Sequence, residues 1–106
     1  MPILLTTPYE LRIGQEPNPT CPRAKLVHVA YHQDQAHVYV EIGDVVSDVW
    51  TKDERSSTLL FIIEGDEFNT LMNTATNDGE SLYEASKRIS YAWLQAHDSE
   101  FAGTIE

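Results

Sequence analysis

The chain has few of the residues on which several classes of function depend. It contains one cysteine, Cys21, in 106 residues, which excludes an internal disulfide and any metal site built from several thiolates. Basic residues are also scarce, because seven Lys and Arg stand against seventeen Asp and Glu, for a formal net charge of −10. Such a chain is poorly suited to direct binding of nucleic-acid phosphates. We therefore expect protein partners and no direct nucleic-acid binding.

Long hydrophobic runs are missing as well. No apolar stretch approaches the roughly 18 residues that a membrane-spanning helix needs, so we expect no membrane partner. The opening segment MPILLTTPYE has neither the basic region nor the apolar length of a signal peptide. What remains, 42% hydrophobic and 23% charged residues, is typical of an ordinary folded domain. We expect residues 1–106 to form a single domain.

Familiar catalytic motifs are absent too. The chain has no G-x-S-x-G elbow and no P-loop. Its paired acids, Asp53-Glu54 and Asp66-Glu67, are neighbours in sequence, and neighbouring side chains on a strand point apart. Cys21 has no base placed to activate it, so we expect an inert thiol. The sequence thus predicts no enzyme activity, no catalytic residues, no metal and no cofactor.

The first part of the chain has the patterns of β-strands. Tyr9, Leu11 and Ile13 alternate with charged residues, which predicts a strand over 8–13. Residues 14–24 hold three prolines and predict an irregular, ordered strap. Residues 58–63, TLLFII, are apolar at every position except the first, which predicts a strand inside the sheet, with helices covering one side and a loop or a partner covering the other.

Residues 25–42 predict a β-hairpin that turns at Asp34-Gln35. In this register one face is the core and consists of Val27, Val29, Tyr31, Val38, Val40 and Ile42. The opposite face carries His28, His32 and His37, with His32 directly across from His37. We interpret this row as a polar surface, with a metal site and a pH-sensitive pair as alternatives.

The period changes to that of helices after Gly65. Apolar spacing predicts helices over 67–75, with Asp66 as N-cap, and over 80–97, whereas 98–106 shows no period. Strands therefore come first and helices last, which predicts an α+β fold: an antiparallel sheet of about four strands with two C-terminal helices packed on one face. The expected parts are a strand and Pro-rich strap (1–24), the sheet (25–63), two helices (65–97) and a tail (98–106).

Acidic residues concentrate towards the C-terminus. Residues 64–106 hold nine acidic and two basic residues, a net charge of −7, against −3 for residues 1–63. The simpler interpretation is a well-solvated surface. The alternative is a contact surface for a basic partner.

A resemblance lies in FIIEGDEFNTLM (Phe61–Met72), SLYEASKRISYAWL (Ser81–Leu94) and the final GTIE. These runs resemble small proteins encoded by bacteriophages and prophages, in which a β-hairpin is followed by a strand, a helix entry and a short amphipathic helix. The resemblance implies a minor virion protein of the tail, baseplate or head, found in the virion or host cytoplasm. It also implies a structural, oligomer-building role without catalysis, and it transfers no functional residues.

Together these features predict a non-enzymatic assembly protein that contacts copies of itself and other protein subunits. The residues expected to make these contacts are apolar and lie near the two ends of the chain: Ile3, Leu4, Leu5, Phe101 and Ile105. One alternative is an acidic inhibitor that imitates nucleic acid and occupies a basic groove of its partner. Another is a small metal-binding protein that uses His28, His32 and His37.

Overall fold

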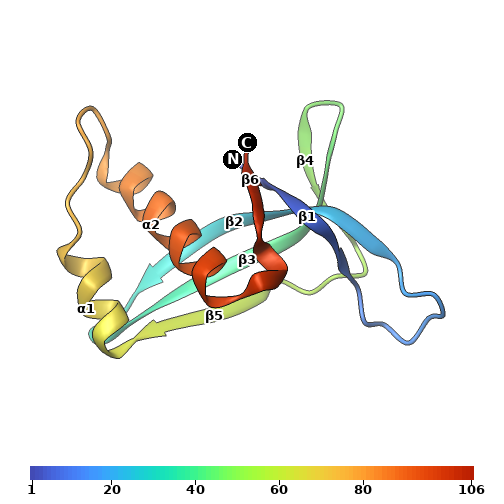
Figure 1. The fold of residues 1–106 in the computed structure, drawn as a ribbon, viewed down its shortest axis with the longest axis horizontal. Helices are drawn as coiled ribbons and strands as arrows, with labels where there is room; N and C mark the ends of the chain where they lie inside the picture. The colour runs from blue at the N-terminus through green and yellow to red at the C-terminus, as the bar shows by residue number, and fades with distance from the viewer.

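One antiparallel sheet, with two helices against one of its faces, makes up the computed structural model, which describes all residues 1–106 (Figure 1). Its elements are, in chain order, β1 (Ile3–Glu10), β2 (Thr20–Tyr31), β3 (Gln35–Val46), β4 (Val49–Lys52), β5 (Leu59–Glu64), α1 (Gly65–Asn73), α2 (Leu82–His97), the 3-10 helix η1 (Ser99–Phe101) and β6 (Gly103–Ile105). This confirms the predicted α+β class, although the sheet has six strands rather than about four. Neither helix has the length and apolar character that crossing a membrane requires.

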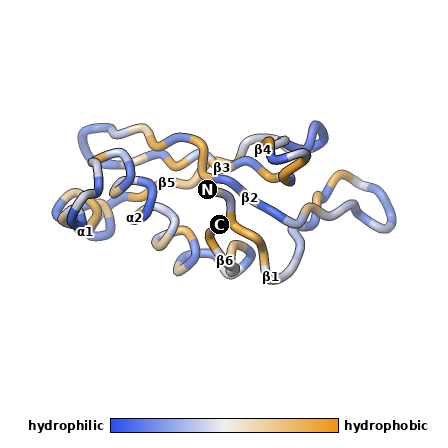
Figure 2. Tube along the Cα trace, turned by 90° about the horizontal axis from the view of Figure 1, so that it is seen from above, coloured by the Kyte–Doolittle hydropathy of each residue, from blue (hydrophilic) through white to orange (hydrophobic).

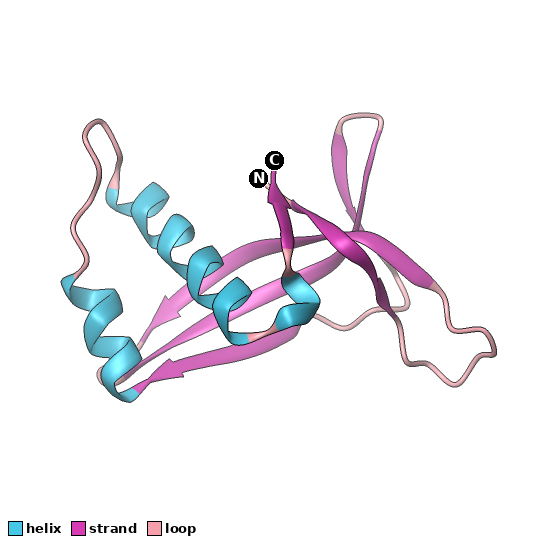
Figure 3. Ribbon diagram, viewed as in Figure 1, coloured by secondary structure: helices cyan, strands magenta, loops and turns pink.

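The strand order is β4-β3-β2-β1-β6, and β5 also pairs with β3. Strand β3 uses the same edge for two partners in succession: β5 along residues 35–40 and β4 along residues 43–46. The helices lie towards one end of the elongated molecule, whereas the β3–β4 hairpin and the 11–19 loop project from the other (Figure 3).

Gly43 lies where β3 passes between β2 and β4, paired with Arg23 on one side and Lys52 on the other. The β4 backbone comes so close that a Cβ atom at Gly43 would clash with the Thr51 carbonyl oxygen. Only glycine permits this approach. Beyond it, Ser47 and Asp48 both have positive φ, 51° and 63°, which is the pattern of a type I′ turn and closes a hairpin that the sequence did not predict.

The central hairpin forms as predicted, but its register differs by two residues. Val29 pairs with Val38 and Tyr31 with Ala36, so the turn lies at 32–34. A shift of two residues preserves the faces, and Val38, Val40 and Ile42 are fully buried as expected. A bulge between Leu26 and His28 then reverses the alternation in β2. Leu26 therefore enters the core in place of Val27, which is half-buried. Tyr31 lies beyond the bulge, opposite Ala36 near the end of the hairpin, and is exposed there, contrary to the prediction.

Several predicted boundaries were wrong near the two ends of the chain. The first strand begins at Ile3 and ends at Glu10, rather than covering 8–13. Residues 20–24 of the expected strap belong to β2, with Pro22 at the irregularity where the β1 pairing shifts between Leu4 and Tyr9. The C-terminal tail is ordered, because β6 pairs with β1. The two ends consequently lie side by side (Figure 1).

The core lies between the sheet and the helices. Phe101 is 1% exposed and contacts two aromatic rings, stacking on Tyr9 at 5.8 Å and meeting Phe61 edge-on at 5.5 Å between centroids. Along the chain the hydrophobic stretches follow β1 and β3, whereas the tip of the 11–19 loop is hydrophilic (Figure 2).

Both helices form close to their predicted positions. Ser81 is the N-cap of helix α2: its hydroxyl accepts from Glu84 N–H at 3.1 Å and donates to the Glu84 carboxylate at 3.0 Å. Helix α1 has Glu64 rather than Asp66 at its N-cap, with no side-chain cap, and Asp66 lies in the first turn. The buried face of α2 holds Ala85, Ser90, Tyr91 and Leu94, whereas Leu82 of the predicted apolar stripe is exposed.

Tyr91 fastens α2 to the sheet. Its ring is 2% exposed, and its hydroxyl accepts a hydrogen bond from Leu26 N–H at 2.8 Å while donating to the Met1 carbonyl. Beyond this point β2 has no neighbouring strand, because the first residue of β1, Ile3, lies opposite Ala24. One hydroxyl thus satisfies two backbone groups that the sheet leaves open.

We expect Tyr91→Phe to lower the free energy of unfolding by about 1–3 kcal/mol, because the buried Leu26 N–H would lose its acceptor. Urea denaturation followed by circular dichroism measures this loss. Tyr83→Phe is the matched control, since its exposed hydroxyl makes no hydrogen bond in the protein, and it should change stability by less than about 0.5 kcal/mol. Equal effects of the two substitutions would contradict the role given to Tyr91.

Candidate interaction surfaces

The clearest exposed apolar feature of the sheet is strand β5. It pairs with β3 on one side and has no strand on the other, so the prediction that residues 58–63 lie inside the sheet was wrong. Ile63 is buried beneath the helices, whereas Leu60 and Ile62 on the opposite face are 49% and 44% exposed. Strand β5 therefore carries apolar side chains on both faces, and the rest of the protein covers only the face that contains Ile63.

The backbone of β5 is also open. His32 N–H donates to Gln35 O at 2.8 Å, so by alternation Ala30 and His37 exchange hydrogen bonds across the central hairpin. The residues of β3 on either side of His37, Ala36 and Val38, therefore direct their N–H and C=O groups to β5, where Ala36 pairs with Ile63. This leaves the N–H and C=O groups of Leu60 and Ile62 pointing outward from the edge. An exposed edge of this kind is a template for another strand.

The histidines share the outer sheet face with these residues. Across the hairpin the His32 and His37 rings are 4.3 Å apart between centroids, although the two residues are not register partners. His28 instead lies against Tyr39, at 5.7 Å. No group of three or more His, Cys, Asp or Glu residues in the structure is arranged to hold a metal ion. The structure thus does not assemble the alternative metal site from the three histidines.

The terminal residues expected to contact partners divide into two groups. Ile3, Leu5 and Phe101 are 0%, 6% and 1% exposed, so the expectation that the domain leaves them uncovered was wrong. Pairing of β1 with β2 and β6 orients Ile3 and Leu5 into the core. Leu4 and Ile105 are partly exposed, at 40% and 37%, and remain candidates for contacts.

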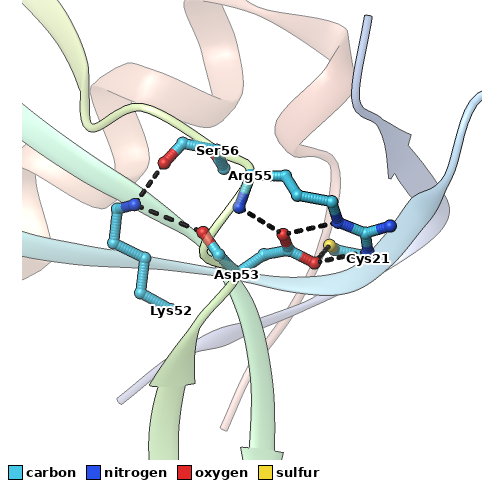
Figure 4. A network of polar contacts seen from close by, with 5 residues as sticks. All are labelled: Cys21, Lys52, Asp53, Arg55 and Ser56. Carbon is cyan, nitrogen blue, oxygen red and sulfur yellow. Dashed lines mark hydrogen bonds and ion pairs between the residues drawn. The ribbon is translucent and has the colours of Figure 1, made fainter. Parts of the chain in front are cut away.

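A polar network around Asp53 fixes the loop after β4 (Figure 4). The Asp53 carboxylate accepts hydrogen bonds from Arg55 N–H at 2.9 Å, from the Arg55 guanidinium at 2.9 and 3.1 Å, and from the Cys21 thiol at 3.4 Å. Lys52 Nζ donates to the carbonyl oxygens of Asp53 and Ser56. The network ties the loop to β2, which gives it a structural role.

The network also shifts the pKa values of the Cys21 thiol and the Asp53 carboxyl group. Burial first, and then the hydrogen bond to Asp53, raise the pKa of Cys21 to about 11. Hydrogen bonds from Arg55 hold the pKa of Asp53 well below its usual range. A thiol that ionises only at high pH is a poor nucleophile. This agrees with the inert thiol expected from the sequence.

The acidic residues of the C-terminal part gather around α1 and the start of α2. Residues 56–86 contain no Lys or Arg. The exposed acids of this segment are Glu64, Asp66, Glu67, Asp78 and Glu84. Glu80 is held by Arg88, whose hydrogen bonds lower the pKa of Glu80 to about 2. The exposed charged residues of segment 56–86 are therefore all acidic.

Sequence reasoning missed the β5 edge, although its signal was present. The run TLLFII was assigned to the inside of the sheet because it is almost entirely apolar, with a loop or a partner expected on its second face. The same pattern also describes an edge strand with one covered face and one that is available to a partner. Comparisons of the chain with protein-family models, curated proteins and solved structures found no match.

We expect Cys21 in the native protein to react about 100-fold more slowly with a thiol reagent than in the denatured chain, at about pH 8. Raising its pKa from 9.0 to about 11 depletes the thiolate by this factor, and burial adds a barrier to access. With a disulfide reagent that releases a coloured thiol, the absorbance measured with and without denaturant gives the two rates. Comparable rates would show that the thiol is neither buried nor suppressed.

We expect Asp53→Asn to lower native stability by about 1–2 kcal/mol near neutral pH. The native pKa lies below the unfolded value of 3.8, so ionised Asp53 stabilises the fold above that value. This contribution disappears as pH falls towards the native pKa, so wild type and variant should converge in acid. Urea midpoints at about pH 7 and pH 3 measure it. Asp48→Asn, in the exposed hairpin turn, is the control that should show no such convergence.

Proposed function

We propose that this chain is a non-enzymatic assembly protein that forms a symmetric oligomer by joining β5 edges. The observation that carries the proposal is the coincidence, on one strand, of an unpaired backbone edge with two exposed apolar side chains, Leu60 and Ile62. Monomeric proteins usually protect an exposed edge with charge, proline or a bulge. Within Leu59–Glu64 only the final residue is charged, and none is proline.

A two-fold axis beside β5 would pair the strand with its own copy. Antiparallel pairing about such an axis is self-complementary, because each strand offers the same outward groups to the other. The outward N–H and C=O groups of Leu60 and Ile62 would form the ladder. Their side chains would continue the outer face of one sheet into the next, where Tyr39 pairs with Leu60 and His37 with Ile62. Burial of apolar area adds to the hydrogen bonds.

The resemblance to small phage-encoded proteins suggests in which kind of particle such an oligomer would be found. We propose a minor structural component of a phage or prophage particle, in which copies of the chain contact each other and further subunits. A joined sheet suits this role because it is rigid and requires no catalytic group. Leu4 and Ile105, which are exposed beside the paired termini, would then be available to other subunits.

The alternative of an acidic inhibitor rests on a different surface. The base-free segment 56–86 places its exposed acids around α1 and the start of α2, which would suit a basic groove. Binding through such a surface would weaken with salt, whereas strand pairing with apolar contacts would not. The two proposals therefore differ in both the residues used and the effect of ionic strength.

We expect light scattering to give a discrete oligomer whose molar mass is stable in salt, and Ile62→Lys to shift it towards monomer. An outward charge beside an edge opposes strand addition, and the apparent dissociation constant should rise at least about tenfold, the equivalent of 1.4 kcal/mol. A monomeric wild type at every concentration and salt would contradict the assembly proposal.

Leu4→Lys is the matched control because Leu4 is 40% exposed, close to the 44% of Ile62, but lies on β1 between β2 and β6. We expect it to leave the molar mass unchanged. If Leu4→Lys dissociates the oligomer and Ile62→Lys does not, the contact lies at the paired termini and the β5 interface is wrong. Melting curves of both variants check that each remains folded.

A further inference from the structure

A second open edge lies on β2, in a groove beneath the helices. The groove has a volume of about 500 Å³, and nine of its fourteen lining residues are hydrophobic. Val27, Val29 and Tyr31 of β2 form one wall. The other comes from both helices, including Leu71, Met72, Leu82, Tyr83 and Ile89.

The wall formed by β2 is a strand edge without a partner. Strand β1 pairs with β2 only along residues 20–24, and Tyr91 closes the edge at Leu26. Since Ala30 bonds to β3 across the hairpin, the N–H and C=O groups of Val29 and Tyr31 point to the other side, into the groove. An extended segment placed here would continue the line of β1 along the unused length of β2.

The helices provide apolar contacts next to this edge. The side chains of Leu82 and Tyr83 are 81% and 67% exposed, and Met72 is 55% exposed, so all three have surface left to cover. Ser86 and Tyr31 share a hydrogen bond between their hydroxyls, which joins the end of β2 to α2. The Tyr91 and Tyr31 contacts therefore mark the two ends of a bounded site rather than a flat surface.

The charge of the groove differs from that of the whole chain. None of the seventeen acidic residues lines it, although the net charge is −10. Its one charged lining residue is Lys87, whose ammonium lies 4.8 Å from the centre of the Tyr83 ring and forms no ion pair. The neighbouring Arg88 is occupied by Glu80. A carboxylate on an occupant would therefore meet an unneutralised positive charge.

We propose that this groove binds an extended segment of a partner protein, which adds as a strand to the β2 edge. The segment alternates apolar residues, which face the helices, with others that face solvent, and it carries a carboxylate opposite Lys87. Backbone hydrogen bonds to Val29 and Tyr31 supply affinity, and the apolar wall and Lys87 select the sequence. This site is separate from the β5 edge used for self-association.

The test is selection from a displayed library of random peptides of about six residues, a length that covers the open edge at residues 27–31. The wild-type protein is the target, and Val29→Pro is the counter-target. Proline at residue 29 removes an N–H that bonds to no strand of the chain, so the sheet should remain intact while a carbonyl oxygen of the added strand loses its donor. We expect enriched peptides to alternate apolar residues, to contain a Glu or Asp, and to bind Val29→Pro at least about tenfold more weakly by fluorescence anisotropy.

Two further variants make the outcome decisive. Leu60→Pro makes the same change on the open β5 edge and should leave peptide binding intact, while it abolishes any self-association. Lys87→Glu, at the surface, should weaken the acidic peptides about fivefold and favour versions with Lys in place of the acid. It also serves as the test if Val29→Pro fails to fold. No enrichment, or peptides that bind wild type and Lys87→Glu equally, would overturn the groove proposal without touching the β5 proposal.

Discussion

The tertiary structure depends on how the sheet is terminated beside Leu26. β2 extends past the first residue of β1 there, so the backbone N–H and C=O groups on that edge of β2 have no strand to bond to. The Tyr91 hydroxyl takes over this function and bonds to Leu26 N–H and the Met1 carbonyl. Because the same side chain belongs to α2, the bond also determines where the helix crosses the sheet. The position of α2 then encloses the core on one side and leaves the groove on the other.

Local patterns predicted the elements well where a single period dominates. The hairpin of 25–42 and both helices were found because alternation and helical spacing are each clear over many residues. Predictions failed where a backbone irregularity interrupts the period. The bulge near Val27 exchanges inner and outer faces partway along β2. The turn at Ser47 and Asp48 uses positive φ angles without the glycine that would announce it.

The candidate surfaces were harder to predict than the elements because they are defined by what is left uncovered. Ile3 and Phe101 are apolar residues near chain ends, a position that indicates frayed or exposed segments, yet pairing between the two ends buries both. Conversely, Leu60 belongs to an apolar run that is typical of a covered strand, yet it is exposed. Strand order decides both outcomes, and no local period encodes it. The open length of β2 is likewise visible only from the pairing, because the first residue of β1, Ile3, lies opposite Ala24 and β1 covers no residue of β2 beyond it.

The pairing of β1 with β6 has a consequence for the order of folding. Ile3 lies opposite Ile105, so this contact closes a loop that is almost the whole chain. Contacts of such sequence separation carry a large closure entropy and tend to form after local ones. During synthesis the central hairpin of β2 and β3 is complete long before β6 exists. The groups of β1 that pair with β6 must therefore wait until residues 103–105 have been synthesised, so the β1–β6 contact is among the later steps that complete the core.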